Sequence, residues 1–329
     1  LFDEPLVLIG EDGAKWEAGA NSAFSVEGRT WVNNHAHVLR PHRNIVLDEW
    51  LIYYLNGSDL MPFVSGMTVP KLNQGQLREI PIPLPPLIEQ QRIVAVLDEA
   101  FDGLARARAN AEANLKCAQE LFEAIKANAL AYDGPDRKRV TLADVSEINS
   151  SLVDPRLEAF ADLPHLGAGN MITGSDELFE VKTAREEKLI SGKYLFDDTT
   201  VLYSKIRPYL RKAARPDFAG LCSADVYPLI PKQGLMDRDF LFHLLLGQDF
   251  TDYAISGSDR AGMPKVNRNH MFAYQVDLPP LDAQQRIASV IDEAQIACRS
   301  VVDLVRHKTS DLEKLGQSLL QKAFAGELT

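Results

Sequence analysis

Few residues in this sequence combine the types and the spacing that catalysis requires. Glu180 and Lys182 form a Glu-x-Lys pattern, which in metal-dependent nucleases belongs to a set of carboxylates that hold Mg²⁺ and activate water. The nearest preceding Pro-Asp pair, Pro135-Asp136, lies far away in a hydrophilic stretch. A three-residue match of this kind arises by chance, so a metal-dependent nuclease is only an alternative interpretation.

Two other short patterns, a possible metal site and a possible phosphate-binding loop, each lack a residue that such a site requires. His35 and His37 would point to the same face of a strand, but no cysteine or third ligand stands near them. A histidine pair satisfied by its neighbours is the simpler interpretation. Gly192-Lys193 is followed by Tyr194, whereas a phosphate-binding loop requires Ser or Thr there.

Basic residues give a stronger signal than any catalytic motif. Residues 204–212 are the densest basic stretch of the chain, and Pro208 favours an extended or turned backbone within it. Two loops, at residues 68–73 and 256–267, end on the same Pro-Lys-apolar-Asn pattern. Basic side chains contact phosphates, and Arg, Lys, Asn and Gln read base edges in the major groove. The candidate DNA contacts are Lys205, Arg207, Tyr209, Arg211, Lys212, Arg260, Lys265 and Asn267, with Thr68, Lys71 and Asn73 from the earlier loop. An ordinary solvated surface remains the alternative.

Composition excludes some classes of protein. The 329 residues allow two domains, and 46% hydrophobic with 25% charged residues is typical of a globular protein. A net charge of −11 argues against non-specific coating of nucleic acid, although it permits local basic patches. No apolar run of about 18 residues occurs, so we expect no membrane span. The three scattered cysteines favour a reducing cytoplasm.

The elements that must position these residues occur twice, 194 residues apart. Leu-Pro-Pro-Leu-x-x-Gln-Gln-Arg-Ile occupies residues 84–93 and 278–287, and the Pro-Lys-apolar-Asn loops and residues 1–8 repeat at the same offset. We interpret this as a domain duplication in which the residues between the repeated motifs have diverged. Residues 138–194 have no counterpart in the first repeat. We therefore expect that the first repeat lacks its opening segment and that the sequence is truncated at its N-terminus; the alternative is a genuinely shorter first repeat.

A long helix is predicted after each double proline. In the first, ten positions alternate in steps of four and three and nine of them are apolar, which is the seam of a coiled coil. These positions are Leu97, Phe101, Leu104, Arg108, Ala111, Leu115, Ala118, Phe122, Ile125 and Ala129. The second helix carries a similar stripe, interrupted by Lys308. Its positions are Ile291, Ala294, Cys298, Val301, Val305, Leu312, Leu315 and Leu319. We expect the two helices to pair within the chain, antiparallel; pairing between chains is the alternative. Asp48 and Asp237 are expected to cap shorter helices.

Together these features resemble the specificity (S) subunit of type I restriction–modification enzymes. The resemblance rests on the two Leu-Pro-Pro-Leu-x-x-Gln-Gln-Arg-Ile segments, the two Pro-Lys-[Leu/Val]-Asn loops, residues 201–210 and the terminal residues 321–328. It covers nearly the full length. Each motif alone is weak, but the combination is highly specific.

The resemblance implies an α+β fold, with two mixed α/β target-recognition domains joined by two long antiparallel coiled-coil helices. The expected boundaries are 1–84 for the first, incomplete recognition domain, 85–132 for the first helix, 133–139 for a linker, 140–278 for the second recognition domain and 279–329 for the second helix. Such a subunit is not itself an enzyme.

The resemblance also implies the partners. They are a bipartite double-stranded DNA target, methyltransferase (M) subunits and restriction (R) subunits, with no membrane. S-adenosylmethionine, ATP and Mg²⁺ would bind those other subunits, so no cofactor is expected here. The helix residues expected to contact partner subunits are Gln90, Gln91, Arg92, Gln284, Gln285 and Arg286. A coiled-coil scaffold without nucleic-acid binding is the remaining alternative.

Overall fold

The computed structural model describes residues 1–66, 68–148, 151–258 and 264–328. The chain divides into two compact units. Unit 1 comprises Leu1–Lys116 and Val301–Thr329, and unit 2 comprises Cys117–Ser300. Each long helix contributes one part to each unit, and the two units are described separately.

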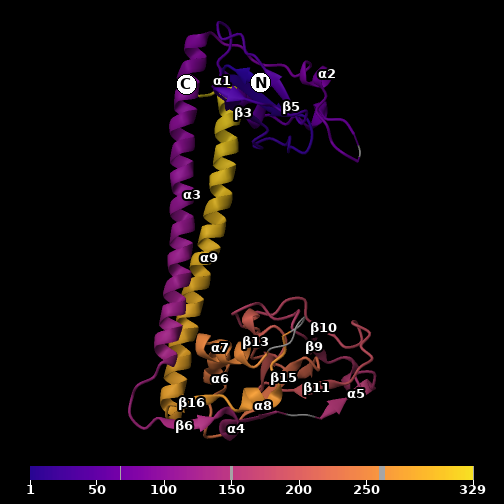
Figure 1. Ribbon diagram of the computed structural model, residues 1–329, viewed down its shortest axis with the longest axis vertical. Helices are drawn as coiled ribbons and strands as arrows, with labels where there is room; N and C mark the ends of the chain where they lie inside the picture. Colours follow the sequence, from indigo (N-terminus) through magenta and orange to yellow (C-terminus); the bar gives the residue numbers. More distant parts are fainter. Residues whose placement is uncertain (67, 149–150, 259–263, 329) are drawn as a thin grey trace. The chain divides into compact units, whose positions relative to one another are not determined.

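Unit 1 contains a small antiparallel sheet covered by a helix (Figure 1). Strand β2, whose first four residues are buried, lies at its centre, in the order β3-β2-β5. Val7 and Ile9 of β2 pack with Leu51 and Leu55 of α1 in the core of the unit. The elements are β1 (Phe2–Asp3), β2 (Leu6–Gly10), β3 (Ala23–Val26), β4 (Arg29–Thr30), β5 (Ala36–Leu39), α1 (Asp48–Gly57), the 3₁₀ helix η1 (Met61–Phe63) and α2 (Gln74–Leu77).

The globular part of unit 2 contains two larger sheets. One has the order β13-β12-β15-β7 and the other β10-β9-β14-β11-β8, and the pair β16-β6 stands beside them. Among the described residues of this unit, the strand pairs are antiparallel except β14 with β9. The elements are β6 (Lys138–Thr141), α4 (Leu142–Val145), β7 (Ser146–Ile148), β8 (Leu152–Val153), α5 (Glu158–Ala161), β9 (Pro164–Leu166), β10 (Lys182–Thr183), β11 (Lys193–Phe196), β12 (Val201–Ser204), η2 (Pro208–Leu210), β13 (Ala213–Ala214), β14 (Gly220–Cys222), β15 (Val226–Pro231), α6 (Arg238–Leu245), α7 (Gln248–Ser256), α8 (Arg268–Phe272) and β16 (Gln275–Leu278).

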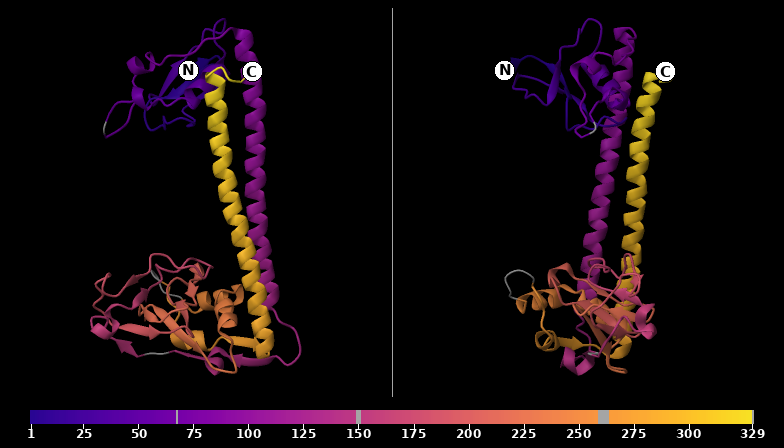
Figure 2. Two further views of the ribbon diagram at one scale, coloured as in Figure 1. Left: turned by 180° about the vertical axis from the view of Figure 1, so that it is seen from behind. Right: turned by 90° about the vertical axis from the view of Figure 1, so that its right-hand side faces the viewer.

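The two long helices are α3 (Leu87–Leu130) and α9 (Leu281–Phe324). Within each unit their segments run side by side in opposite directions (Figures 1 and 2). In unit 1, Ile93 and Leu97 near the start of α3 share a core with Leu320 and Ala323 near the end of α9. In unit 2 the opposite ends meet, because Phe122 and Ala129 pack on the core that contains Ile287 and Ile291.

The seam predicted for α3 is confirmed by burial. Its nine apolar positions are all buried or half-buried, and Arg108 is exposed. The seam predicted for α9 is wrong at Leu315, which is 50% exposed. Gly316 occupies the seam instead, where Phe101 and Leu104 lie close to the place that a side chain would fill. A glycine has no apolar side chain to signal its burial, so the spacing of leucines pointed to its neighbour.

The two predicted helix caps had different outcomes. Asp237 caps α6 as expected, because its carboxylate accepts hydrogen bonds from the amides of Asp239 and Phe240. Asp48 does not cap α1; Leu47 is the capping residue, and Asp48 is the first helical residue and pairs with Arg43 at 2.8 Å. The α+β class, with two mixed domains and two long helices, is confirmed. No helix in the described part of the chain is long and apolar enough to cross a membrane.

Candidate nucleic-acid interface

The first glutamine of each Gln-Gln-Arg repeat is an internal anchor. Gln90 is 0% exposed; its Oε1 accepts from the Leu47 amide at 2.9 Å, and its Nε2 donates to the Ile45 and Pro85 carbonyls at 2.8 Å. Gln284 is equally buried and makes the same three bonds, with the Asp237 amide and with the Leu235 and Pro279 carbonyls.

These bonds fasten the start of a short helix to the start of a long one in each unit. The side chains of Gln90 and Gln284 are therefore enclosed by their own units. Of the six helix residues predicted to contact partner subunits, the other four, Gln91, Arg92, Gln285 and Arg286, are exposed. Among these, Arg92 pairs with Glu89 at 2.6 Å and Arg286 with Asp282 at 2.7 Å.

A second repeated position completes the anchor. Asp98 of α3 accepts a hydrogen bond from the Tyr53 hydroxyl at 2.6 Å, and Asp292 of α9 is bonded to His243 at 2.8 Å. Arg215 adds an ion pair to Asp292 at 2.5 Å. Burial alone would raise the pKa of Asp292, but the bonds from His243 and Arg215 outweigh it and lower the pKa to about 2.

The Pro-Lys-apolar-Asn loops also have a structural function. Leu72 and Val266 are 0% and 1% exposed, and their amides donate to the Glu11 and Lys205 carbonyls at the same distance, 2.8 Å. Asn267 accepts a hydrogen bond from the His270 amide and caps α8. The recurrence of this pattern is thus explained by strand bridging, burial and capping, and gives no separate argument for base contacts.

Asn73 has the corresponding position in unit 1. It forms a capping box with Gln76 at the start of α2. Thr68 lies exposed in the preceding loop. Lys71 pairs with Glu11 at 2.9 Å, and this hydrogen bond raises the pKa of Lys71.

In unit 2 the structure brings several of the predicted DNA contacts around one polar hollow of about 340 Å³. Lys205, Lys265 and Asn267 line it together with Tyr227. Asp225 lies between the two lysines, with Nζ–Oδ1 distances of 3.6 Å to Lys205 and 3.1 Å to Lys265. Lys205 also lies over the Tyr227 ring, 5.5 Å from its centroid.

The remaining predicted residues of the basic stretch separate into two groups. Arg207 and Tyr209 are exposed, and Arg207 adopts a left-handed backbone conformation, φ 51°, which turns the chain out of β12. Arg211 is held by Glu123 of α3 at 3.2 Å, and Lys212 donates to the Ala168 carbonyl at 2.7 Å. The predicted contact Arg260 lies outside the described residues.

The unit 1 positions equivalent to those around the polar hollow of unit 2 have different residue types. The strand pairing Val7–Leu39 matches Val201–Leu229, so His37 stands where Tyr227 stands. Both side chains bond the equivalent carbonyl: His37 to Leu72 at 2.6 Å, and Tyr227 to Val266 at 3.1 Å. Glu11 replaces Lys205, and His35, bonded to Asp12 at 2.7 Å, replaces Asp225.

Sequence reasoning missed Asp225 and Tyr227 for a specific reason. Equivalent residues of the two repeats differ by 194 in residue number up to the end of β2, but by 190 from β3 through α1. The difference changes because the unit 1 loop between β2 and β3 is longer than its counterpart. A search at a single fixed offset therefore loses the central strands. Loops tolerate such insertions while the flanking strands keep their pairing.

The nuclease alternative gains no support from the geometry. Glu180 and Lys182 are exposed. Within the described ranges no group of three or more His, Cys, Asp or Glu side chains is arranged to hold a metal ion.

The fold and the paired anchors define a duplicated α/β recognition scaffold on two long helices, and sequence comparison gives its class. The family model for the type I restriction modification DNA specificity domain matches residues 1–114 and 136–297. The chain belongs to this family. Specificity subunits of type I restriction–modification systems recognise DNA and do not catalyse a reaction themselves, and they assemble with other subunits.

Named relatives and solved structures agree. The type I restriction enzyme EcoDI specificity subunit of Escherichia coli is 26% identical over all of this chain and 79% of the relative. The putative specificity subunit S.HindORF215P of Haemophilus influenzae is 24% identical over 90% of this chain and 76% of its own length.

Two solved structures share the fold. A chain from a type I R-M complex, solved for its assembly and conformational transition, matches with a TM-score of 0.78 at 18% identity, covering 98% of this chain and 82% of that one. The HsdS subunit of Thermoanaerobacter tengcongensis matches with a TM-score of 0.57 at 21% identity, covering 89% of this chain and 74% of that one.

Proposed function

We propose that this chain is the cytoplasmic specificity subunit of a type I restriction–modification enzyme, and that unit 2 contacts double-stranded DNA with the residues around its polar hollow. The observation that carries the proposal is the grouping of Lys205, Lys265 and exposed Arg207 in one region of a chain with net charge −11. The Arg207 amide donates to the Pro264 carbonyl at 2.8 Å. This hydrogen bond joins the segment that follows β12 to the segment that precedes α8.

Within this group the residues have different roles. Lys205 and Lys265 both pair with Asp225, and Lys205 also lies over the aromatic ring of Tyr227, so their ammonium groups are positioned before DNA arrives. Arg207 has no side-chain partner within the described part of the chain, and its planar guanidinium suits a guanine edge or a phosphate. Arg211 and Lys212 remain proposed contacts, although their existing bonds would have to be exchanged.

The two units would read different half-sites of a bipartite target. Where unit 2 presents Lys205, unit 1 presents Glu11, and where unit 2 presents Tyr227, unit 1 presents His37. A carboxylate accepts hydrogen bonds, for example from cytosine N4, whereas lysine donates, for example to guanine O6. Thr68, Lys71 and Asn73 are the proposed contacts of unit 1. Because equivalent positions of the two units carry side chains with opposite hydrogen-bonding chemistry, we expect the two halves of the DNA target to differ in sequence.

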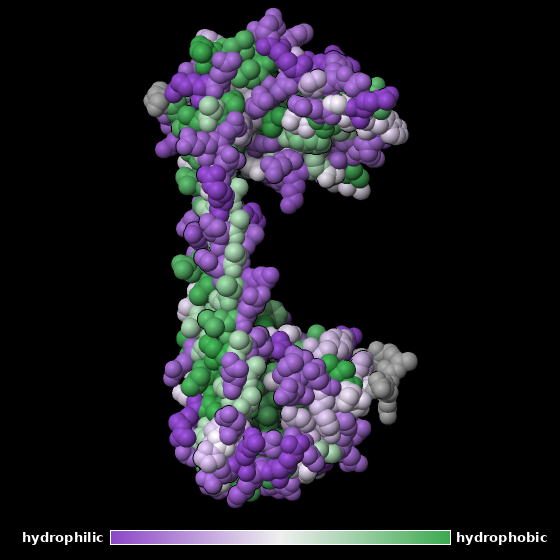
Figure 3. Space-filling model, turned by 60° about the vertical axis from the view of Figure 1, so that its left-hand side comes forward, coloured by the Kyte–Doolittle hydropathy of each residue, from purple (hydrophilic) through white to green (hydrophobic). Residues whose placement is uncertain are grey.

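The long helices would hold the methyltransferase subunits, and the restriction subunits would join that assembly. Both helices expose large apolar side chains among hydrophilic ones (Figure 3). In unit 1 these are Ile88, Val96, Leu304 and Leu315, and in unit 2 they are Leu121, Val290 and Ile296. Leu304 and Ile296 are 66% and 62% exposed, so burying them under a partner would remove apolar surface from water. The exposed residues Gln91, Arg92, Gln285 and Arg286 would contribute polar contacts.

Salt-dependent binding tests the DNA contacts. Removing three phosphate contacts with Lys205→Ala, Arg207→Ala and Lys265→Ala together should reduce the slope of log K against log salt by about 2.7, at about 0.9 per contact. The probe is a mixed-sequence DNA duplex, bound by the chain in complex with its methyltransferase subunits.

A matched variant, Arg137→Ala with Lys138→Ala and Arg156→Ala, removes the same charge from exposed positions of unit 2 that do not line the polar hollow. Its slope should stay near the wild-type value. Equal losses in both variants would mean that only net charge matters. No loss in either would favour a scaffold without nucleic-acid binding.

A further inference from the structure

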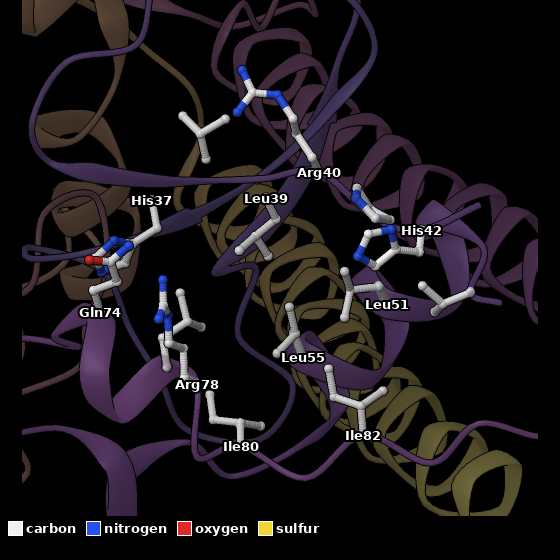
Figure 4. Close-up of a pocket in the computed structure, with 14 residues that line it drawn as sticks. His37, Leu39, Arg40, His42, Leu51, Leu55, Gln74, Arg78, Ile80 and Ile82 are labelled. Carbon is white, nitrogen blue, oxygen red and sulfur yellow. The ribbon is translucent and has the colours of Figure 1, made fainter. Parts of the chain in front are cut away.

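Unit 1 contains an open apolar hollow of about 410 Å³. It lies between the edge of β5, helix α1 and the residues that follow α2 (Figure 4). Leu39, Leu51, Leu55, Ile80 and Ile82 form its centre. Arg40, His42, Gln74 and Arg78 lie around them.

The equivalent place in unit 2 is filled by the chain itself. Leu229, Leu241, Leu245 and Val276, which correspond to Leu39, Leu51, Leu55 and Ile82, are buried in one core. The correspondence follows from the matching strand pairs of β5 and β15 and from the matching Gln90 and Gln284 anchors. The side chains that cover this core are Leu142, Val145 and Ile148, which are 0%, 2% and 8% exposed.

The covering segment of unit 2 is short and continuous. Residues 138–141 pair with β16, residues 142–145 make one helical turn, and residues 146–148 pair with the free edge of β15. Backbone bonds tie it in: the Leu142 amide donates to the Tyr274 carbonyl at 2.9 Å, and the Lys232 amide donates to the Val145 carbonyl at 2.8 Å.

Unit 1 keeps both edges that such a segment would use. Among the described residues β5 pairs with β2 alone, and residues 81–84, which match β16, belong to no strand. Exposed strand edges beside an apolar surface accept an added strand, which gains backbone hydrogen bonds as well as buried apolar area.

We propose that the unit 1 hollow is a docking site for a polypeptide segment built like residues 138–148: a strand, one helical turn and a second strand, with apolar side chains at the positions of Leu142, Val145 and Ile148. One strand would pair with residues 81–84 and the other with the open edge of β5. The three apolar side chains would enter the hollow among Leu39, Leu55 and Ile82. This inference does not depend on the proposed DNA contacts, which lie in other residues.

A peptide with the sequence of residues 138–148 tests the proposal when it is added to the full chain at up to about 1 mM, which would detect even weak binding. The amide hydrogens of residues 36–40 that face away from β2, and those of Ile82 and Leu84, should exchange about tenfold more slowly, because they become hydrogen-bonded; Pro41, Pro81 and Pro83 have no amide hydrogen. The amides of Leu229 and Ile230, which lie in the part of β15 that already pairs with β7, should not change. The same peptide with Leu142→Asp, Val145→Asp and Ile148→Asp should give no protection.

Two variants of the chain locate the binding. Ile82→Asp places a charge in the hollow and should abolish protection, whereas Ile88→Asp, at a position 74% exposed on α3, should leave it intact. The proposal is overturned if no protection appears at the highest peptide concentration, or if the Asp-substituted peptide protects equally well. It is also overturned if these amides become protected without peptide as the chain forms dimers, because a second copy would then cover the hollow.

Discussion

The buried glutamine at the start of each long helix gives the sharpest prediction about stability. Replacing Gln90 with alanine leaves the Leu47 amide and the Ile45 and Pro85 carbonyls without the partner that the structure shows. A buried backbone group that loses its partner costs about 1–3 kcal/mol. The carbonyls and the space left by the side chain add to this, so unit 1 should lose roughly 3 kcal/mol.

Tryptophan fluorescence measures this loss, because all three tryptophans (Trp16, Trp31 and Trp50) lie in unit 1. Trp50 is 2% exposed, and its indole N–H donates to the Pro83 carbonyl close to the anchor. The midpoint of urea unfolding should fall by about 1.5 M, taking about 2 kcal/mol per M for the dependence of stability on urea.

The neighbouring residue supplies the control. Gln91 has the same side chain one position later on α3 but is exposed, so Gln91→Ala should shift the midpoint by no more than about 0.3 M. The reasoning is refuted if the two alanine variants unfold at the same urea concentration.

Three further predictions concern the rest of the molecule. The pKa of Asp292, about 2, lies below the ordinary value of about 3.9, so the stability it provides is complete above that value and is lost as pH falls toward 2. In urea unfolding followed by circular dichroism, the deficit of Asp292→Asn should be about 2 kcal/mol at neutral pH and should shrink from pH 5 downward; a deficit that is constant with pH would contradict this. Gly316→Leu should destabilise unit 1 by about 1–3 kcal/mol through overpacking, whereas Leu315→Ser at the exposed neighbouring position should have little effect, as fluorescence-detected unfolding would show. Exposed Cys117 should react with a thiol reagent in the native protein, whereas Cys222, whose thiol pKa is raised by burial, should be labelled only after unfolding; mass spectrometry distinguishes the two, and early labelling of Cys222 would argue against its burial.

Much of the fold could be predicted because strong local signals agreed. The double prolines mark where the long helices begin, within two residues of Leu87 and Leu281, and the heptad spacing identified the seam of α3 correctly. The duplication revealed two mixed domains. Prediction was wrong where a residue contributes by lacking a side chain, as Gly316 does, or where a backbone anchor replaces a side-chain cap, as at Leu47.

The candidate site was harder to predict than the fold, because repetition marks structure as readily as function. Gln90, Gln284, Asn73 and Asn267 recur since each unit needs the same anchors and caps. Residues that differ between the units carry more information about recognition, but a search for repeated motifs does not detect them. Asp225, which orients two lysines, became visible only when strand pairing supplied the correct correspondence.

The most direct test of the central claim is to map methylated positions in the genomic DNA of cells that make this chain together with its methyltransferase subunits. Two chemically unlike recognition surfaces predict one methylated motif made of two unlike blocks of specified bases, separated by a fixed number of unspecified ones. Exchanging Lys205 and Arg207 for alanine should relax or abolish one block and leave the other unchanged. A symmetric or uninterrupted motif, or one that this exchange leaves intact, would contradict the account.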